Sequence, residues 1–121
     1  MLKINCSKEN PLTICSIYAT LNSTMNWKIY KTTEYLKWFD GLAKDRKAQL
    51  IFRLQKIVEH GYLGNSRALG DGLFELKFND GMRVYFCFSG KQIILLLIGG
   101  DKHGQEKDIK KARNLKKSYA P

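Results

Sequence analysis

The stretch LFELKFNDGMRVYFCF, residues 73–88, decides the fold, because it places two alternating segments on either side of a tight turn. In residues 73–78 the apolar side chains of Phe74, Leu76 and Phe78 alternate with the charged side chains of Glu75 and Lys77. A period of two is typical of a strand with one face in the core. Asn-Asp-Gly at 79–81 is a hairpin turn signal. Residues 73–88 therefore predict an antiparallel hairpin.

The neighbouring segments extend this hairpin into a small α+β domain. Residues 92–98 are almost continuously apolar, which predicts a central strand buried on both faces. A final helix is predicted from about residue 105 to 118. Upstream, we expect a strand at 25–30, two helices and a glycine-rich loop at 62–72. The predicted order is strand, two helices, three-strand antiparallel meander and C-terminal helix, with two helices on one face of the sheet.

The two upstream helices are indicated by their caps and their apolar stripes. Thr32 or Thr33 is suited to cap the first helix, and Asp45 the second. Gly61 suits the left-handed position that ends the second helix. The predicted buried stripe of the second helix consists of Ala48, Ile51, Leu54, Ile57 and Val58.

Composition narrows the class of protein and of partner. The 121 residues carry a formal net charge of +10, which favours a polyanion: nucleic acid, an anionic membrane surface or an acidic protein. Three irregularly spaced cysteines indicate neither a disulfide framework nor a zinc site, so we expect reduced thiols and a cytoplasmic location. Cys87 lies in an apolar run and is interpreted as a core residue. We expect no metal, no cofactor and no membrane span.

Residues 1–24 differ from the rest of the chain. They loosely imitate a signal peptide, but the apolar stretch is short and interrupted by Thr and Ser. We expect them to be an extension that the fold does not need, with the domain comprising residues 25–121.

Basic residues on neighbouring predicted elements form the candidate site. Arg67 lies in the predicted loop, Lys77 and Arg83 on adjacent strands, and Lys102 and His103 after the central strand. Cations aimed at phosphate oxygens stabilise the charge that builds up when an RNA 2′-OH attacks phosphorus. Such a set suits cleavage of RNA without metal. The same residues can equally hold a phosphate backbone without cutting it.

Two further residues are candidate RNA contacts. Lys107 is one of the basic residues of the predicted final helix. Two roles are open for Tyr85, which either stacks on a base or packs in the core.

Three strings then carry a resemblance to a known family: GDGLFELK at 70–77, GMRVYF at 81–86 and LLLIGGDKHGQEKDIKKA at 95–112. They resemble the RelE/HigB superfamily of toxins from type II toxin–antitoxin modules, in the branch of addiction module killer proteins. The last string contains Gly-Gly-Asp-Lys-x-x-Gln-x-x-Asp-Ile-x-x-Ala, a pattern quite specific to that branch. The likeness extends over about residues 26–118.

The resemblance implies a microbial-ribonuclease-like α+β fold and an endoribonuclease (mRNA interferase) that inhibits translation by cutting mRNA on the ribosome. It also implies a cognate antitoxin, often a helix-turn-helix protein. By position, Arg83 matches the strand arginine that contacts the scissile phosphate. Lys102 matches the basic residue of the loop before the last helix, and Lys77 a strand residue near the substrate. Arg67 is matched as a further RNA contact.

The chain also departs from the family pattern. His103-Gly104 stands where members often carry Ser-Thr, so two interpretations of His103 are open: an additional acid or base, or a neutral variation. The last-helix tyrosine that some relatives use is replaced by Ile109. The general base is therefore not identified, and two alternatives stay open: a non-catalytic RNA- or ribosome-binding module, and an antitoxin-binding module on the same fold.

Overall fold

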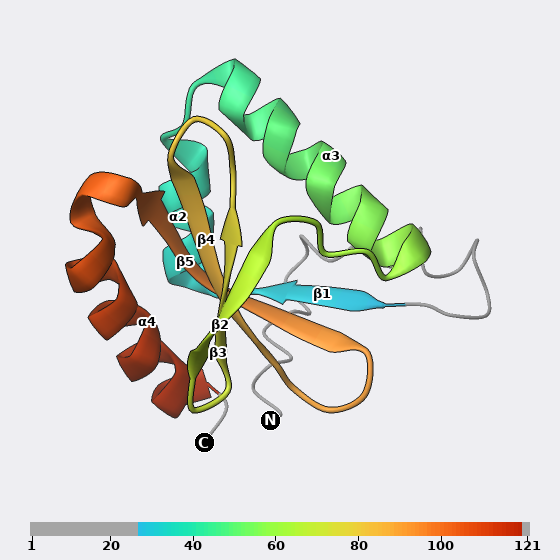
Figure 1. Cartoon of the computed structure of the whole chain (residues 1–121), viewed down its shortest axis with the longest axis vertical. Coiled ribbons are helices and arrows are strands. Elements are labelled where there is room, and N and C mark those ends of the chain that lie inside the picture. The colour runs from blue at the N-terminus through green and yellow to red at the C-terminus, as the bar shows by residue number, and fades with distance from the viewer. Residues whose placement is uncertain (1–26, 120–121) are drawn as a thin grey trace.

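The computed structural model describes residues 27–119 (Figure 1), so the expected extension at 1–24 lies outside the described residues. The elements are β1 (Lys28–Lys31), α2 (Thr33–Asp40), α3 (Lys44–His60), β2 (Ser66–Gly70), β3 (Leu73–Lys77), β4 (Met82–Phe88), β5 (Ile93–Asp101), the short 3₁₀ helix η2 (Lys102–Gly104) and α4 (Gln105–Tyr119). The predicted α+β class and the hairpin at residues 73–88 are confirmed.

The strands form one five-stranded sheet in the order β1-β5-β4-β3-β2. Strands β2 to β5 are antiparallel neighbours, as expected for a meander. However, β1 pairs with β5 in parallel, so the prediction of a wholly antiparallel sheet is wrong at this edge. The chain between β1 and β5, which contains α2, α3 and strands β2 to β4, is long enough for the crossover that parallel strands require.

Strand β2 is a second departure from the sequence prediction, because residues 62–72 were expected to form a loop. Ser66 to Ala68 pair with Leu76 to Phe74, and a bulge follows between Ala68 and Gly70. The meander therefore has four strands. Most β2 side chains are only partly buried or exposed, which explains why the segment lacks the apolar alternation of an ordinary strand.

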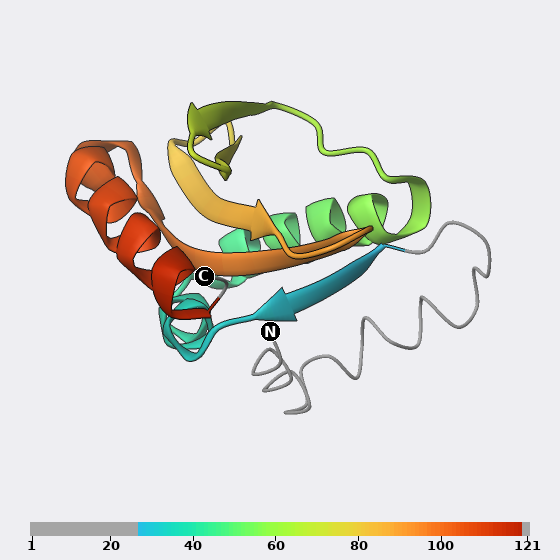
Figure 2. The same cartoon turned by 90° about the horizontal axis from the view of Figure 1, so that it is seen from below.

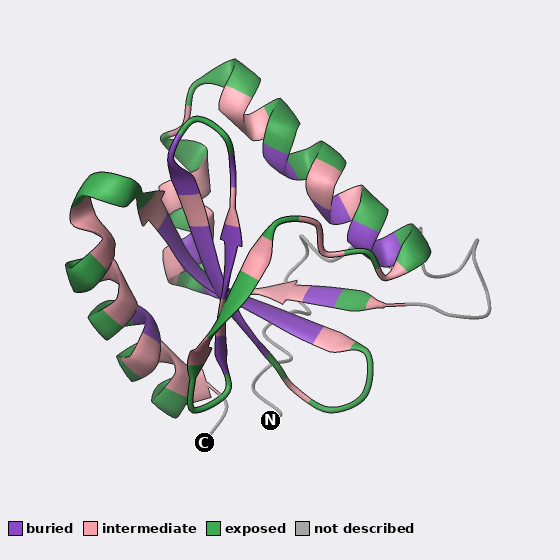
Figure 3. Cartoon of the chain, viewed as in Figure 1, coloured by how far each residue is buried: buried purple, intermediate pink, exposed green. Residues whose placement is uncertain are grey.

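Helices cover both faces of the sheet, and each face has its own core. Figure 2 shows the sheet curling around α3, with α4 on the opposite side. The core beneath α2 and α3 includes Tyr35, Leu54 and Phe86, whereas the core beneath α4 includes Leu73, Tyr85, Cys87 and Ala112. Because α4 covers one face and α2 and α3 cover the other, consecutive residues along β4 and β5 are buried (Figure 3).

Cys87 is buried in the α4-side core, as predicted, and burial raises the pKa of its thiol to about 11. A thiol with so high a pKa is protonated at neutral pH and is a poor nucleophile.

Local signals explain where the first two helices begin and end. The Thr32 hydroxyl accepts the Tyr35 N–H at 2.9 Å and donates to the Leu97 carbonyl at 2.6 Å, which ties the start of α2 to β5. Gly61 ends α3 with the predicted left-handed backbone, φ 69°.

The start and the buried face of α3 differ from the prediction. Ala43, and not Asp45, is its N-cap, and no side chain bonds there. Its buried residues are Leu50, Leu54, Ile57 and Val58. Ala48 and Ile51 are exposed, because the inward stripe runs through Leu50 at one end of the helix.

Candidate functional site

Three of the predicted catalytic cations lie at one end of the sheet. Lys77 on β3 is opposite Arg83 on β4, and Arg83 is opposite Gly100 on β5, two residues before Lys102. The Lys102 backbone N–H donates to the Gly81 carbonyl at 2.9 Å, which fixes η2 against the β3–β4 turn. We call Lys77, Arg83 and Lys102 the cationic row.

A buried carboxylate lies beside this row, and sequence reasoning assigned it no role. The Glu75 side chain is completely buried. It accepts a hydrogen bond from Arg67 Nε at 2.8 Å and another from Gln105 Nε2 at 2.6 Å. Arg83 Nε lies 3.7 Å from Glu75 Oε2, an ion pair without a hydrogen bond. We call Glu75, Arg67, Arg83 and Gln105 the carboxylate cluster.

The carboxylate cluster joins three successive strands to a helix that begins 30 residues after Glu75. Arg67 is the strand partner of Glu75 on β2, Arg83 comes from β4, and Gln105 begins α4. Strand alternation had placed Glu75 on the same face as Lys77, which was the available signal. Its burial depends on α4 closing over that face, and the pattern of a single strand does not reveal this.

Arg83 is held at the base of the row. Its side chain is only 13% exposed. One guanidinium nitrogen, Nη1, donates to the carbonyls of Met82 at 3.1 Å and Phe78 at 3.4 Å. These contacts fix the guanidinium near the β3–β4 turn and leave its Nε with no hydrogen-bond partner among residues 27–119. Arg67, in contrast, has a half-exposed side chain.

Tyr85 takes the packing role of the two that were open. The residue is fully buried beneath α4, so its ring is not available to stack on a base in this structure. Burial, followed by the negative charges of Glu75 and Asp108, raises the pKa of its hydroxyl. Tyr85 therefore stays protonated and neutral at physiological pH.

The Gly99-Gly100 pair gives β5 room between two helices. A Cβ on Gly99 would lie 2.2 Å from the Trp38 indole of α2. A Cβ on Gly100 would lie 2.0 Å from Asp108 Oδ2 of α4. Burial, followed by the charge of Asp101, raises the pKa of the Asp108 carboxyl. The close packing of Trp38 and Asp108 against β5 explains why the motif at 99–112 has glycine at positions 99 and 100 and pairs Gly100 with Asp108.

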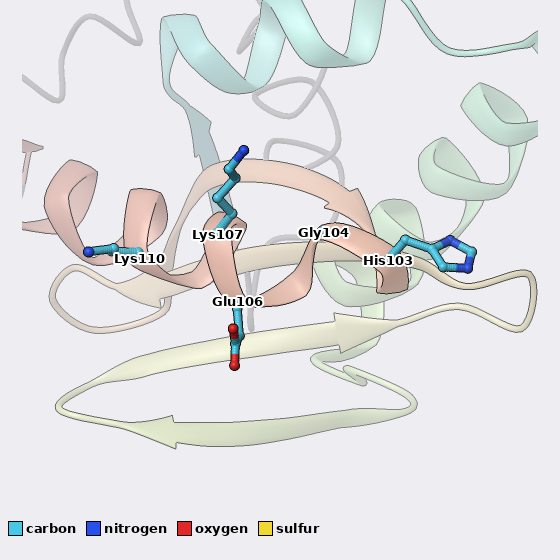
Figure 4. A pocket seen from close by; sticks show the side chains of 5 residues that line it. All are labelled: His103, Gly104, Glu106, Lys107 and Lys110. Carbon is cyan, nitrogen blue, oxygen red and sulfur yellow. The ribbon is translucent and has the colours of Figure 1, made fainter.

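His103 and Lys107 line a shallow hollow of about 630 Å³ at the start of α4, together with Gly104, Glu106 and Lys110. Figure 4 shows that their side chains point in different directions instead of converging. The His103 side chain is 85% exposed, with Nδ1 3.7 Å from Asp101 Oδ1. The imidazole of His103 is therefore in solvent, although the residue follows Lys102 of the cationic row. Lys107 lies outside that row.

Within residues 27–119, no three His, Cys, Asp or Glu side chains are grouped so that they could hold a metal ion. No helix in that range is sufficiently long and apolar to cross a membrane.

Comparison with known proteins identifies the family. The model of the phage-derived Gp49-like proteins (DUF891) matches residues 37–117. An uncharacterised protein of Haemophilus influenzae is 35% identical over 94 residues, which cover 75% of this chain and 94% of that protein.

Solved toxin structures share the fold. An arginine double mutant of E. coli toxin RelE in the free state superposes with a TM-score of 0.60 at 15% identity, covering 74% of this chain and 98% of RelE. A chain of the intact E. coli RelBE toxin–antitoxin complex gives 0.52 at 15% identity, covering 63% and 95%. The chain therefore belongs to the Gp49-like family (DUF891) and has the fold of the RelE toxins.

Proposed function

We propose that this chain is the toxin of a toxin–antitoxin pair and acts as a metal-independent endoribonuclease on mRNA, in the cytoplasm and on the ribosome. The observation that carries the proposal is the cationic row at the end of the sheet, set on a RelE fold. The net charge of +10 supports a polyanionic substrate.

In the proposed reaction the RNA 2′-oxygen attacks the adjacent phosphorus while the bond from phosphorus to the 5′-oxygen breaks. The products are a 2′,3′-cyclic phosphate and a 5′-hydroxyl. Arg83 and Lys102 stabilise the charge on the non-bridging oxygens, which is greatest in the transition state. The 2′-OH proton must leave and the 5′-oxygen must gain one, and Lys77, Lys102 and His103 are the candidate carriers.

The carboxylate cluster supports a defined position for Arg83. A guanidinium fixed before the substrate arrives loses little conformational freedom on binding a phosphate. Arg67, half-exposed and bonded to Glu75, is a proposed RNA contact at the rim of the cluster. Lys107 is proposed as a weaker contact with the RNA backbone from the start of α4.

The proposed partner is a cognate antitoxin, for which a helix-turn-helix protein is the expectation. The fold is shared with a chain of the RelBE toxin–antitoxin complex.

The second candidate function is RNA or ribosome binding without cleavage. Two observations favour it: Glu75 already pairs with both Arg67 and Arg83, and the imidazole of His103 is exposed to solvent. A weakly catalytic chain would still hold RNA through Lys77 and Lys102.

Inducible expression in a bacterial host distinguishes the two. The parent chain is expected to arrest growth, and primer extension should find cuts within translated regions of mRNA. Arg83→Ala and Lys102→Ala should relieve both effects while remaining folded. Lys117→Ala removes the same charge from an exposed position in the last turn of α4 and should behave as the parent. A parent chain that leaves growth and translated mRNA unaffected would refute the enzymatic proposal.

A further inference from the structure

A second hollow, of about 250 Å³, lies between α3 and the end of β3. Its lining includes Gln49, Phe52 and Arg53 from α3, Asn65 before β2, and Lys77 and Asn79 at the β3–β4 turn. Lys77 is therefore common to this hollow and to the cationic row.

The base of the hollow is fixed by Arg53. Its guanidinium donates to three backbone carbonyls, those of Leu63 at 2.9 Å, Lys77 at 3.0 Å and Asn65 at 2.7 Å. The guanidinium carbon also lies 4.4 Å from the centre of the Phe78 ring. These contacts join α3 to the end of β3, so the hollow has a defined shape before any ligand enters.

The rim presents one aromatic ring and several unused amides. Phe52 is 61% exposed, and the Lys56 ammonium lies 5.1 Å from its ring centre. The side-chain amides of Gln49, Asn65 and Asn79 are exposed and form no hydrogen bond with another described residue. An aromatic face beside free amides is the combination that stacks an unpaired base and hydrogen-bonds to its edge.

We propose that this hollow binds one unpaired base of the RNA strand whose backbone lies on the cationic row. The inference rests on the proposed function, because it names a base-binding subsite for the same substrate. Lys77 and Arg83 are strand partners, so their Cα atoms lie about 5 Å apart. A strand whose phosphate lies between these two cations can place a neighbouring base over Phe52.

The roles within the subsite follow from chemistry. Phe52 stacks on the base without discriminating its identity. Asn65 and Asn79 supply donors and acceptors that select among base edges. Lys56 and Lys77 neutralise the adjoining phosphates.

Binding is measured with short 2′-O-methyl oligonucleotides, which lack the attacking hydroxyl and cannot be cut by the proposed mechanism. Fluorescence anisotropy should give about tenfold weaker binding for Phe52→Ala, the loss expected from one base–aromatic stack. Ile51→Ala removes a neighbouring exposed apolar side chain that does not line the hollow, and should bind as the parent. Both positions are exposed, so both variants should melt near the parent temperature.

The sites of cleavage in translated mRNA give the second readout. Asn65→Ala should still cut but with a weaker base preference beside the cut. Equal oligonucleotide affinity for Phe52→Ala and the parent would overturn the inference, even if Phe52→Ala weakened antitoxin binding. A parent that binds no oligonucleotide would overturn it as well. If the parent binds through Phe52 yet cuts no mRNA, the cleavage proposal fails and the base subsite stands.

Discussion

Replacing Glu75 tests whether its carboxylate is the centre that holds the β2, β4 and α4 residues of the site together. Glu75→Ala removes the acceptor of two hydrogen bonds and the negative charge nearest Arg83. Glu75→Gln keeps the shape and one carbonyl oxygen but removes the charge. In the Gln variant Arg67 retains an acceptor, and Gln105 can turn its own amide to accept from the new NH₂.

The expected losses follow from burial. Removing one partner of a buried ion pair costs about 3–5 kcal/mol. In Glu75→Ala the half-exposed Arg67 is hydrated by water, whereas the charge of Arg83, only 13% exposed, stays largely uncompensated. Because only one of the two arginines loses its compensation, we expect a loss of stability at the lower end of this range, about 3 kcal/mol. A charge-assisted hydrogen bond contributes about 1 kcal/mol more to stability than a neutral one. Because the Glu75 carboxylate accepts hydrogen bonds from Arg67 and Gln105, Glu75→Gln should lower the free energy of unfolding by roughly 2 kcal/mol.

Urea denaturation at pH 7 measures both free energies of unfolding, and the Glu75→Ala loss corresponds to a melting temperature lower by about 12–24 °C. Glu106→Gln, an exposed glutamate of α4 with no ion pair to a described residue, is the control and should change stability by less than about 0.5 kcal/mol. A double-mutant cycle with Arg67→Ala isolates the pair. If Glu75→Gln is as stable as the parent, the charge of Glu75 does not hold the cluster together.

Three further changes test the supporting structure. Gly99→Ala should destabilise by about 2 kcal/mol, because its Cβ would overlap Trp38. Gly41→Ala, with φ −84° and only an ordinary van der Waals contact to the Trp38 carbonyl at 3.7 Å, should be near neutral in the same urea titration. Thr32→Val should cost about 2 kcal/mol in thermal melts, since both hydrogen bonds of the cap are lost; Thr32→Ser should recover most of that stability. A backbone hydrogen bond from Met82 lowers the pKa of the Asp80 carboxyl below its ordinary value of 3.8. The stability that this carboxylate contributes is therefore present above pH 3.8 and lost as the pH falls through the lowered pKa. Asp80→Asn should flatten the decline in melting temperature on acidification below that pH, and an unchanged slope would contradict this.

Much of the architecture could be predicted from the sequence because it depends on local chemistry. Alternation in residues 73–88 predicted the hairpin, and Thr32 and Gly61 predicted helix limits that the structure confirms. Strand β2 was missed because its exposed residues have little apolar periodicity. The direction of β1 was missed because strand polarity depends on the path of the whole chain.

The candidate site was predicted only in part, for a related reason. Cationic residues on adjacent strands could be placed by register, so Lys77 and Arg83 are neighbours as expected. Burial of Glu75 and Tyr85 depends on α4, which follows these strands in the sequence. The side chain of Gln105, the first residue of α4, donates a hydrogen bond to Glu75. Long-range covering of one face by a helix has no signature in the strand that it covers.

The parallel pairing of β1 with β5 also determines when this fold can form. The described backbone partners of β1 lie in the last third of the chain, and the Thr32 hydroxyl reaches Leu97, 65 positions further along. Until β5 has left the ribosome, β1 and α2 have no sheet edge on which to dock. Closing so long a loop raises contact order and slows folding. The last step of sheet assembly therefore waits for β5 to be synthesised and released from the ribosome, even though β1 is made first.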